Sequence, residues 1–507
     1  MTAQSTVPAA GPGSETAGNS RRWLILAVIG VAQLVITLDL SVMNLALPSA
    51  QHALGFSDAG RQWVVTAYAL SFGSLLLFCG RLADLIGRKV TFLAGLAGFA
   101  AASAVGGASV SFAMLVTARA CQGAFAALLA PAALSLLTTT FTDPKQRGTA
   151  FGVFGAVAAS GAGLGLLIGG ALTSYLSWRW CLYVNLVFAG TAMIGAALLL
   201  GGQHRAPGAR LDAPGVAAVS GGMFCLVYGF SNAASRGWHA QSTWGFLAAG
   251  AVLLAVFAAW QTRAAHPLLP LRIILDRNRA GAYLALLVNG AGLFGISLFL
   301  IYYTQTTLGY SAIISGVAML PVVVVSGAMA NVGNIPLMRR LGPKPLISIG
   351  LLCNTAGMAW LTRIGVHSGY ASALLGPLLV IGIGMGLVFA MAPNTGTFGV
   401  VPRDAGVASA TVQVGPQLGG SIGTALLNTI AATAATGYLA SHLRGRPAPQ
   451  LAQLAAVHGY TTVFWWCAGI FAVGTVICGT LLRAGPLTRP VGTSARQPSR
   501  QATAARS

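Results

Sequence analysis

The sequence predicts an all-α polytopic membrane protein with 14 transmembrane helices. First, 55% of its 507 residues are hydrophobic and only 7% are charged, whereas roughly 25% are charged in an ordinary soluble domain. Second, apolar stretches of about 18 to 25 residues recur along the chain, and each is long enough to cross a ~30 Å hydrocarbon core as a helix. Third, Lys and Arg concentrate in alternate connections, which is typical of membrane topology. These observations exclude a soluble globular protein.

The expected helices are separated by short, more polar connections. In chain order they cover residues 23–47, 62–80, 90–109, 113–138, 149–173, 181–201, 214–231, 243–262, 280–303, 312–333, 345–363, 371–393, 406–430 and 460–482. The seventh and eighth are rich in Gly, Ala and Ser and have the weakest apolar signal.

The distribution of Lys and Arg predicts the orientation. With the N-terminus inside, the inner connections and tails hold 22 of the 29 basic residues, and the outer connections hold six. The remaining one, Arg119, lies within an expected helix. This bias places both termini in the cytoplasm and accounts for the net charge of +21 without a nucleic-acid partner.

We expect a 6 + 2 + 6 arrangement, which is supported by the register in which the second half weakly repeats the motifs of the first, as described below. We expect a disordered N-terminus over residues 1–20, a six-helix bundle over 21–202, a two-helix insert with its loops over 203–279, a second six-helix bundle over 280–482 and a disordered basic tail over 483–507.

The connection between the second and third helices has the most specific motif. It reads Gly80-Arg81-Leu82-Ala83-Asp84-Leu85-Ile86-Gly87-Arg88-Lys89. This segment resembles the signature loop of the major facilitator superfamily, in which two glycines allow a tight turn and the acid pairs with basic groups and a helix N-terminus. The resemblance implies a latch that holds the cytoplasmic gate shut, formed by Gly80, Arg81, Asp84, Gly87, Arg88 and Lys89. The alternative is an ordinary positive-inside loop.

The fourth helix carries a charged residue inside an apolar stretch. Leu115, Arg119, Gln122, Gly123 and Ala126 are similar to a second motif of the same superfamily, and helical spacing places Arg119 and Gln122 on one face. A permanently charged Arg within a bilayer is costly, so we interpret Arg119 as functional. The alternative is an Arg whose side chain extends to the membrane surface.

Asp39 is the only acid within an expected helix. The other acids fall in expected loops or tails, namely Glu15, Asp58, Asp84, Asp143, Asp212, Asp276 and Asp404. The segment Leu38–Pro48 resembles the first-helix motif of the fourteen-helix drug:proton antiporter family. We therefore predict that Asp39 is the proton-coupling acid and that Arg119 competes with its proton. The alternative is a purely structural ion pair.

Small residues mark the fifth helix. Gly161, Gly165 and Gly169 form a stripe, followed by Gly170, which lets another helix approach closely. The stripe resembles the antiporter motif of this superfamily, except that Leu166 occupies a proline position, which puts a proline-dependent bend in doubt.

Trp178–Trp180 and Tyr183–Asn185 are similar to a further segment of the fourteen-helix family, with Val187 in place of a proline. An interfacial aromatic belt is the alternative interpretation of the two tryptophans.

The second half repeats the first weakly, as in transporters built from repeats. Gly415, Gly419 and Gly423 repeat the glycine stripe, and Met338–Lys344 repeats the signature loop in degraded form, with Arg339 in the place of Asp84.

The chain lacks the motifs of ATP-driven transporters and of metal-dependent proteins. It has no GxxxxGK phosphate loop and no metal-ligand spacing, and its seven cysteines are scattered within apolar runs. All histidines lie in or near expected loops, namely His52, His204, His239, His266, His367, His442 and His458. We therefore expect neither a cofactor nor a metal, and no enzymatic activity.

The resemblance implies proton-coupled efflux of hydrophobic or amphipathic drugs or antibiotics by alternating access. We expect a monomer in a bacterial cytoplasmic membrane whose partners are an amphipathic small molecule, protons and lipid. Candidate cavity residues are the polar groups Gln33, Asn44, Tyr68, Gln122, Asn289 and Gln413. The alternatives are an importer or uniporter of the same fold, or a membrane sensor or enzyme.

Overall fold

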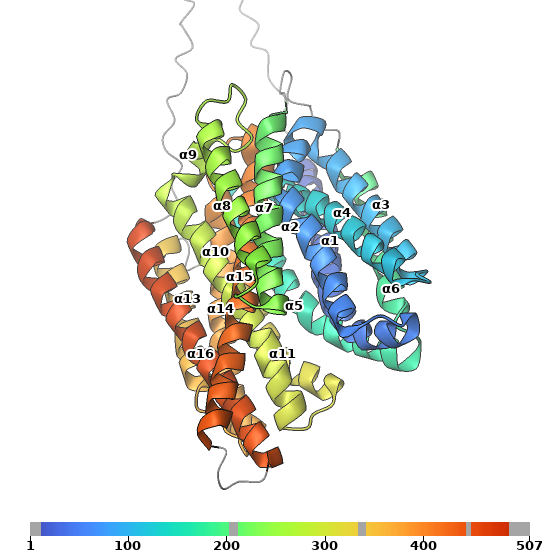
Figure 1. Cartoon of the computed structure of the whole chain (residues 1–507). Coiled ribbons are helices and arrows are strands. Elements are labelled where there is room, and N and C mark those ends of the chain that lie inside the picture. Colours follow the sequence, from blue (N-terminus) through green and yellow to red (C-terminus); the bar gives the residue numbers. More distant parts are fainter. Residues whose placement is uncertain (1–11, 202–210, 333–340, 443–447, 486–507) are drawn as a thin grey trace, which may run out of the picture.

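The computed structural model describes residues 12–201, 211–332, 341–442 and 448–485. These ranges are almost entirely helical and contain no strand (Figure 1). Fourteen of their helices have 19 or more residues: α1 Pro12–Leu54, α2 Asp58–Ile86, α3 Arg88–Gly107, α4 Phe112–Thr140, α5 Pro144–Tyr175, α6 Trp180–Leu199, α7 Ala213–Arg236, α8 Gln241–Gln261, α10 Arg277–Tyr302, α11 Ala312–Val332, α13 Pro343–Leu361, α14 Leu375–Thr397, α15 Ala405–His442 and α16 Ala448–Leu481. Short elements join them, namely α9 Leu271–Ile274, η1 Tyr303–Thr307, η3 Tyr370–Leu374 and η4 Pro402–Asp404.

The helices confirm the predicted all-α membrane class. Each long helix overlaps one expected span, including the weak seventh and eighth. Among the described residues, 12 helices are long and apolar enough to cross a membrane. The other two are α11, whose described apolar part is only Ile313–Met329, and α13. The total of 14 spans and the side of the termini therefore stay predictions.

Several helices extend beyond the ranges expected from the sequence, and three of these extensions move residues discussed above. α1 begins at Pro12 and so includes part of the N-terminus that we expect to be disordered, because the first expected helix continues upstream without a break. α2 continues to Ile86 and ends only where Gly87 has a φ of 99°, so Asp84 lies in its last turn instead of in a loop. Similarly, His458 lies within α16.

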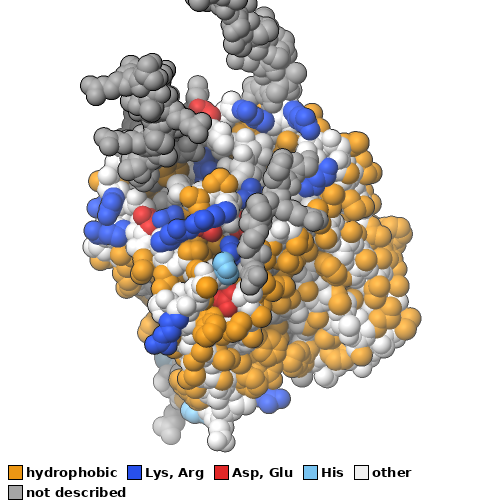
Figure 2. Space-filling view, turned by 90° about the horizontal axis from the view of Figure 1, so that it is seen from above, with side chains coloured by type: hydrophobic (Ala, Val, Ile, Leu, Met, Phe, Trp, Pro, Cys, Tyr) orange, Lys and Arg blue, Asp and Glu red, His pale blue; other side chains and the backbone are white. Residues whose placement is uncertain are grey.

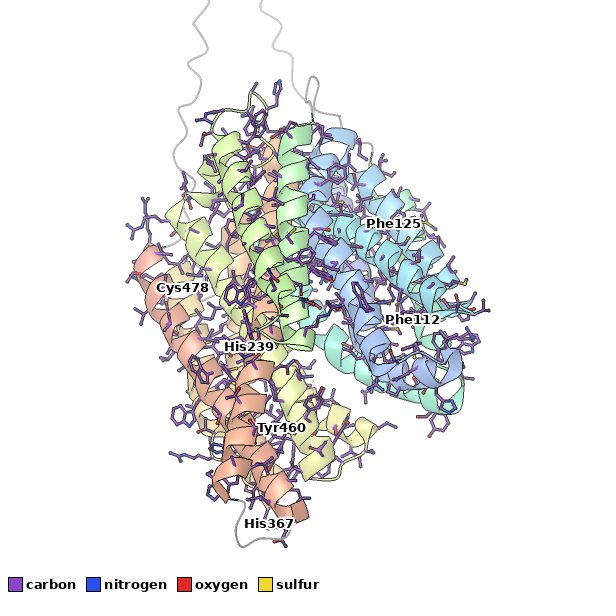
Figure 3. The ribbon with its side chains drawn as sticks, in the orientation of Figure 1. Phe112, Phe125, His239, His367, Tyr460 and Cys478 are labelled. Atoms are coloured by element: carbon purple, nitrogen blue, oxygen red, sulfur yellow. The ribbon has the colours of Figure 1, made fainter. Side chains whose placement is uncertain are left out.

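The helices pack as two groups with a pair between them. In the N-terminal group (α1–α6), α1 packs on α5 and α6, and α4 packs on α2 and α3. In the C-terminal group (α10–α16), α10 packs on α15, and α13 packs on α14 and α16. α7 and α8 pack on each other, and α7 also contacts α2 and α15, one helix from each group (Figure 1 and, with side chains, Figure 3). The exact boundaries of the predicted units stay predictions.

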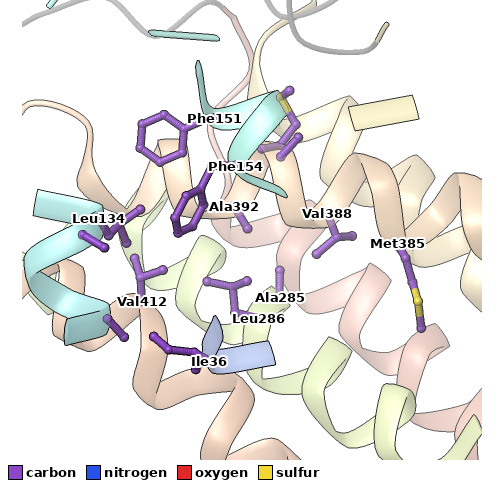
Figure 4. Close-up of a cluster of buried hydrophobic side chains, with 14 of the residues drawn as sticks. Ile36, Leu134, Phe151, Phe154, Ala285, Leu286, Met385, Val388, Ala392 and Val412 are labelled. Atoms are coloured by element: carbon purple, nitrogen blue, oxygen red, sulfur yellow. The ribbon is translucent and has the colours of Figure 1, made fainter. Parts of the chain in front are cut away.

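A buried apolar core extends across both groups. Ile36, Leu134 and Phe154 contribute from the N-terminal group, and Leu286 and Val412 from the C-terminal group (Figure 4). α5 contacts α11 and α14, and α2 contacts α15, so the groups meet along two faces. Burial of these side chains stabilises the arrangement in which the groups are in contact.

One end of the molecule gathers most of the described basic side chains. We call it the signature-loop end, after residues 80–89. Lys and Arg surround a few acidic side chains there, whereas apolar side chains cover the flank (Figure 2). The end of α6 is fixed at the same place: Arg21 donates to the Leu199 carbonyl at 2.9 Å, and Lys89 donates to the carbonyls of Ala197 and Leu200. Cations at a helix C-terminus are favourable because they offset its partial negative charge.

Candidate functional site

The centre of the N-terminal group holds a buried ion pair. Arg119 of α4 donates through Nη1 to Asp39 Oδ2 of α1 at 2.6 Å, and both side chains are only 1% exposed. Arg119 therefore does not extend to a surface. Two charges this far from water are tolerated only when each has close partners, because desolvation otherwise costs several kcal/mol per ion.

Two amide side chains complete the surroundings of the carboxylate. Asn185 of α6 donates to Asp39 Oδ1 at 2.7 Å, and Gln122 of α4 donates to the same oxygen at 3.2 Å. Gln122 also donates to Ser103 Oγ of α3 at 2.7 Å. Asp39 thus links α1, α3, α4 and α6 in one hydrogen-bonded network, which we call the Asp39 network.

Arg119 has acceptors besides Asp39. Its Nη1 donates to Gln122 Oε1 at 2.9 Å, and its Nε donates to the Val64 carbonyl at 3.4 Å. Its guanidinium carbon lies 4.6 Å from the centroid of the Tyr68 ring. A cation above an aromatic face is attracted by the ring quadrupole. Arg119 would therefore keep partners if Asp39 became neutral.

Sequence reasoning predicted the pair but missed part of the network. Asn185 is in the family-like segment after the fifth helix, and that resemblance is the only signal that could have marked it. Ser103 and the Val64 carbonyl have no such signal, because small polar residues and backbone groups occur throughout the expected helices.

The glycine stripe of α5 lies against α1 next to Asp39. A Cβ at Gly165 would be 2.6 Å from Ser41 Cβ, and one at Gly169 would be 3.0 Å from Val42 Cα. A Cβ at Gly161 would overlap Thr37, whereas Gly170 instead approaches Ile313 of α11. The stripe therefore sets how closely α1 approaches α5.

The equivalent stripe in the second half has the same relation to α10. A Cβ at Gly415 would lie 3.1 Å from the Tyr283 carbonyl oxygen, and one at Gly423 would lie 2.7 Å from the Ala291 carbonyl oxygen. α15 and α10 thus repeat the packing of α5 and α1.

The signature loop joins the two groups. Asp84 accepts hydrogen bonds from the backbone N–H groups of Gly406 and Val407 at 2.9 and 3.2 Å, at the start of α15. A carboxylate is favourable at a helix N-terminus because the free N–H groups there carry partial positive charge. Arg88 lies 3.5 Å from Asp84 and donates to the Pro402 carbonyl.

Two other loop residues act differently. A Cβ at Gly80 would be 2.7 Å from the Gly406 carbonyl oxygen, so glycine is required for the close approach of α2 and α15. Lys89, which we expect in the latch, binds the end of α6 within its own group. Its contacts stabilise the N-terminal group and do not join the groups.

A second contact at this end comes from a residue that sequence reasoning missed. Arg147 of α5 donates to Asn394 Oδ1 and Thr397 Oγ1 of α14, both at 2.8 Å. Its sequence context shows only a basic residue in an inner connection. The Asp84 and Arg147 contacts together show that the signature-loop end is closed in this structure.

The structure does not bring all the candidate cavity residues together at one site. Gln122 and Tyr68 belong to the surroundings of the Asp39–Arg119 pair, and Gln33 is buried. Asn289 is buried in the other group, where it accepts a hydrogen bond from Asn354 at 3.1 Å. Gln413 is half-buried, and Asn44 is exposed and makes no hydrogen bond among the described residues.

The family-like segment at the start of α6 has a packing role. Arg179 donates to the carbonyls of Gly107 and Ser109 at 3.0 and 2.6 Å, and so caps the end of α3. Trp178 is buried and Trp180 is exposed, so only Trp180 suits an interfacial belt. Val187 is 65% exposed, while the Leu166 side chain, His204 and Met338–Arg340 lie outside what the structure describes.

Comparisons with known proteins show the family. The family model described as Major Facilitator Superfamily matches residues 29–424. The chain belongs to the major facilitator superfamily. It is 44% identical to the puromycin resistance protein pur8 of Streptomyces alboniger, over 91% of this chain and 92% of the relative. It is 38% identical to the cephamycin export protein CmcT of Amycolatopsis lactamdurans, over 84% of this chain and 89% of the relative.

A solved structure shows the same fold. The crystal structure of the human organic anion transporter MFSD10 (TETRAN) matches 90% of this chain and 99% of its own length, with a TM-score of 0.61 and 15% identity. The family and these relatives are transporters, and the chain is a multi-pass membrane protein of the bacterial inner membrane.

Proposed function

We propose that the protein exports hydrophobic or amphipathic drugs or antibiotics in exchange for protons, by alternating access. The observation that carries this proposal is the ion pair of Asp39 and Arg119, buried in the centre of one helix group while the signature-loop end is closed. The printed names of two relatives, a puromycin resistance protein and a cephamycin export protein, support export. Because those two names refer to different antibiotics, the proposal names a class of compounds and not one antibiotic.

The geometry supports a specific coupling step. A proton on Asp39 would remove the charge that holds Arg119, and Arg119 would then keep Gln122 Oε1, the Val64 carbonyl and the Tyr68 ring as partners. Neutralising one member of the pair therefore leaves no unpartnered buried cation, which would otherwise be strongly unfavourable. Loss of the proton to the opposite side restores the pair. No cofactor takes part in this step.

The proposal assigns a state to the structure. With the termini in the cytoplasm, the closed signature-loop end is the cytoplasmic end, so the structure represents a state that is closed to the cytoplasm. Return to the inward-open state requires the Asp84 and Arg147 contacts to break. We propose that a monomer carries out this cycle and that it is not an enzyme.

Transport in inside-out vesicles tests this function. We expect puromycin, a cephamycin or a hydrophobic dye to accumulate when the vesicle interior is acidified. The accumulation should collapse when a protonophore is added, because the gradient is the energy source. Accumulation that persists with the protonophore would contradict proton coupling. Uptake into intact cells, with no accumulation in the inside-out vesicles, would favour the importer.

A further inference from the structure

We propose that Asp404 is a second closing residue of the signature-loop end, and that Arg272 of α9, on the connection after the inserted helices, positions it. The inference rests on the proposed alternating access, because it concerns how the closed end opens. It assigns a role to the connection between α8 and α10, which the coupling mechanism does not use.

Asp404 is a buried acid that three segments share. Its side chain is 4% exposed, and it ends η4 immediately before α15. Arg272 contacts Oδ2 at 2.6 Å, Arg81 of the signature loop lies 3.8 Å from Oδ1, and the neighbouring Arg403 lies 4.0 Å from Oδ2. Asp84 also faces this region, through its bonds to the start of α15.

The two carboxylate oxygens have different partners. In the part of the chain that the structure describes, Oδ2 makes its one short contact with Arg272, and Oδ1 is directed to Arg81 across the boundary between the groups. A bond to one oxygen restricts rotation of the carboxylate, so Arg272 keeps the other oxygen oriented towards Arg81. Without Arg272, the nearest cations among the described residues would be 3.8 and 4.0 Å away, beyond hydrogen-bonding distance. A buried acid left without a hydrogen-bonded cation is less stable.

Arg272 is itself held by the inserted pair. Its neighbour Ile273 is buried in a cluster with Leu268 of the same connection, Met223 of α7 and Phe257 of α8, and this cluster also includes Val407 of α15. The backbone carbonyl of Arg272 accepts a hydrogen bond from Arg279 of α10 at 3.2 Å. The position of α9 therefore depends on α7, α8 and α10.

A network of hydrogen bonds anchors this connection to the ends of α7 and α8. Gln261 at the end of α8 accepts a hydrogen bond from the Leu269 N–H at 3.0 Å and donates to Asp212 at 2.9 Å. Burial opposes the charge of Asp212, but hydrogen bonds from Trp260 and Gln261 outweigh it and hold the pKa of Asp212 below its ordinary value. Asp212 thus remains a charged acceptor that ties α7 to α8. Through α9, the inserted pair favours the closed end.

Hydrogen exchange of the purified full-length protein tests this inference without substrate or a proton gradient. The readout is the exchange of residues 80–91 and 405–412, on the two sides of the closed end. Exchange of amides protected by closure rises with the open population. We expect Arg272→Ala and Asp404→Asn each to accelerate exchange on both sides by about tenfold, as befits loss of a hydrogen bond to a charged group.

Companion variants separate positioning from general destabilisation. The double variant Arg272→Ala/Asp404→Asn should match Asp404→Asn alone, because Arg272 acts through Asp404. Arg272→Lys should restore exchange to within about twofold of wild type, and Arg272→Gln should behave like Arg272→Ala. Arg263→Ala, an exposed base on the same connection, is the control and should change nothing.

Two outcomes would overturn the proposal: unchanged exchange in Arg272→Ala, or single effects that multiply in the double variant. Because this test measures no transport, failure of the export assay would leave it valid. Failure of the exchange test would likewise leave the export assay valid.

Discussion

At the scale of residues, the central feature is a carboxylate of α1 whose partners come from two other helices, α4 and α6. Asp39 accepts from Arg119, Gln122 and Asn185, and the last of these bonds joins α6 to the network. The sequence indicates Asp39 and Arg119 because charges inside apolar stretches are rare and costly. The sequence cannot indicate Ser103, because the hydrogen-bond partner of Ser103 depends on which helices become neighbours.

The bond from Asn185 gives a direct prediction. Asn185→Ala should slow gradient-driven uptake into vesicles by about tenfold, because the carboxylate loses a donor and hydrogen bonds to charged groups contribute about 1.5–3 kcal/mol. Initial rates at matched protein levels measure this effect. Thr191→Ala, at an exposed position on the same helix, is the control. An Asn185→Ala rate within twofold of wild type would exclude a role for this bond.

At the scale of elements, small residues set how closely particular pairs of helices approach. Gly161, Gly165 and Gly169 bring α5 against α1, and the stripe of α15 does the same with α10. The spacing of glycines predicts a close approach, but a stripe alone does not identify the partner helix. The helix ends were less predictable, since α2 continues to Ile86 and α1 begins at Pro12, in stretches where polar composition hides a helix.

A larger side chain in the stripe should disturb the Asp39 network indirectly. Gly165→Leu should reduce transport by at least about tenfold, because even its Cβ would lie 2.6 Å from Ser41 Cβ and push α1 away from α5. Vesicle uptake measures the loss of transport, and the yield of monodisperse protein shows whether the variant still folds. Gly190→Ala, where no atom lies within 4 Å of the added Cβ, should retain activity. Normal transport by Gly165→Leu would show that the close approach is dispensable.

At the scale of the whole molecule, the sequence predicts the class of fold well because hydropathy and charge report directly on a bilayer. It also indicates the inserted pair, which the structure places against α2 and α15. The state of the molecule was not predictable. Closure of the signature-loop end depends on contacts between residues far apart in the chain, such as Asp84 with Gly406 and Arg147 with Asn394.

The central claim is that Asp39 couples protons to transport and is not merely half of a structural ion pair. The most direct test compares two modes of transport in reconstituted vesicles of Asp39→Asn: accumulation driven by a proton gradient, and exchange of labelled for unlabelled substrate without a gradient. Asp276→Asn is the matched control, because asparagine can still cap α10 as Asp276 does. We predict that Asp39→Asn loses accumulation and keeps exchange. Gradient-driven accumulation at the wild-type level in Asp39→Asn would contradict the account.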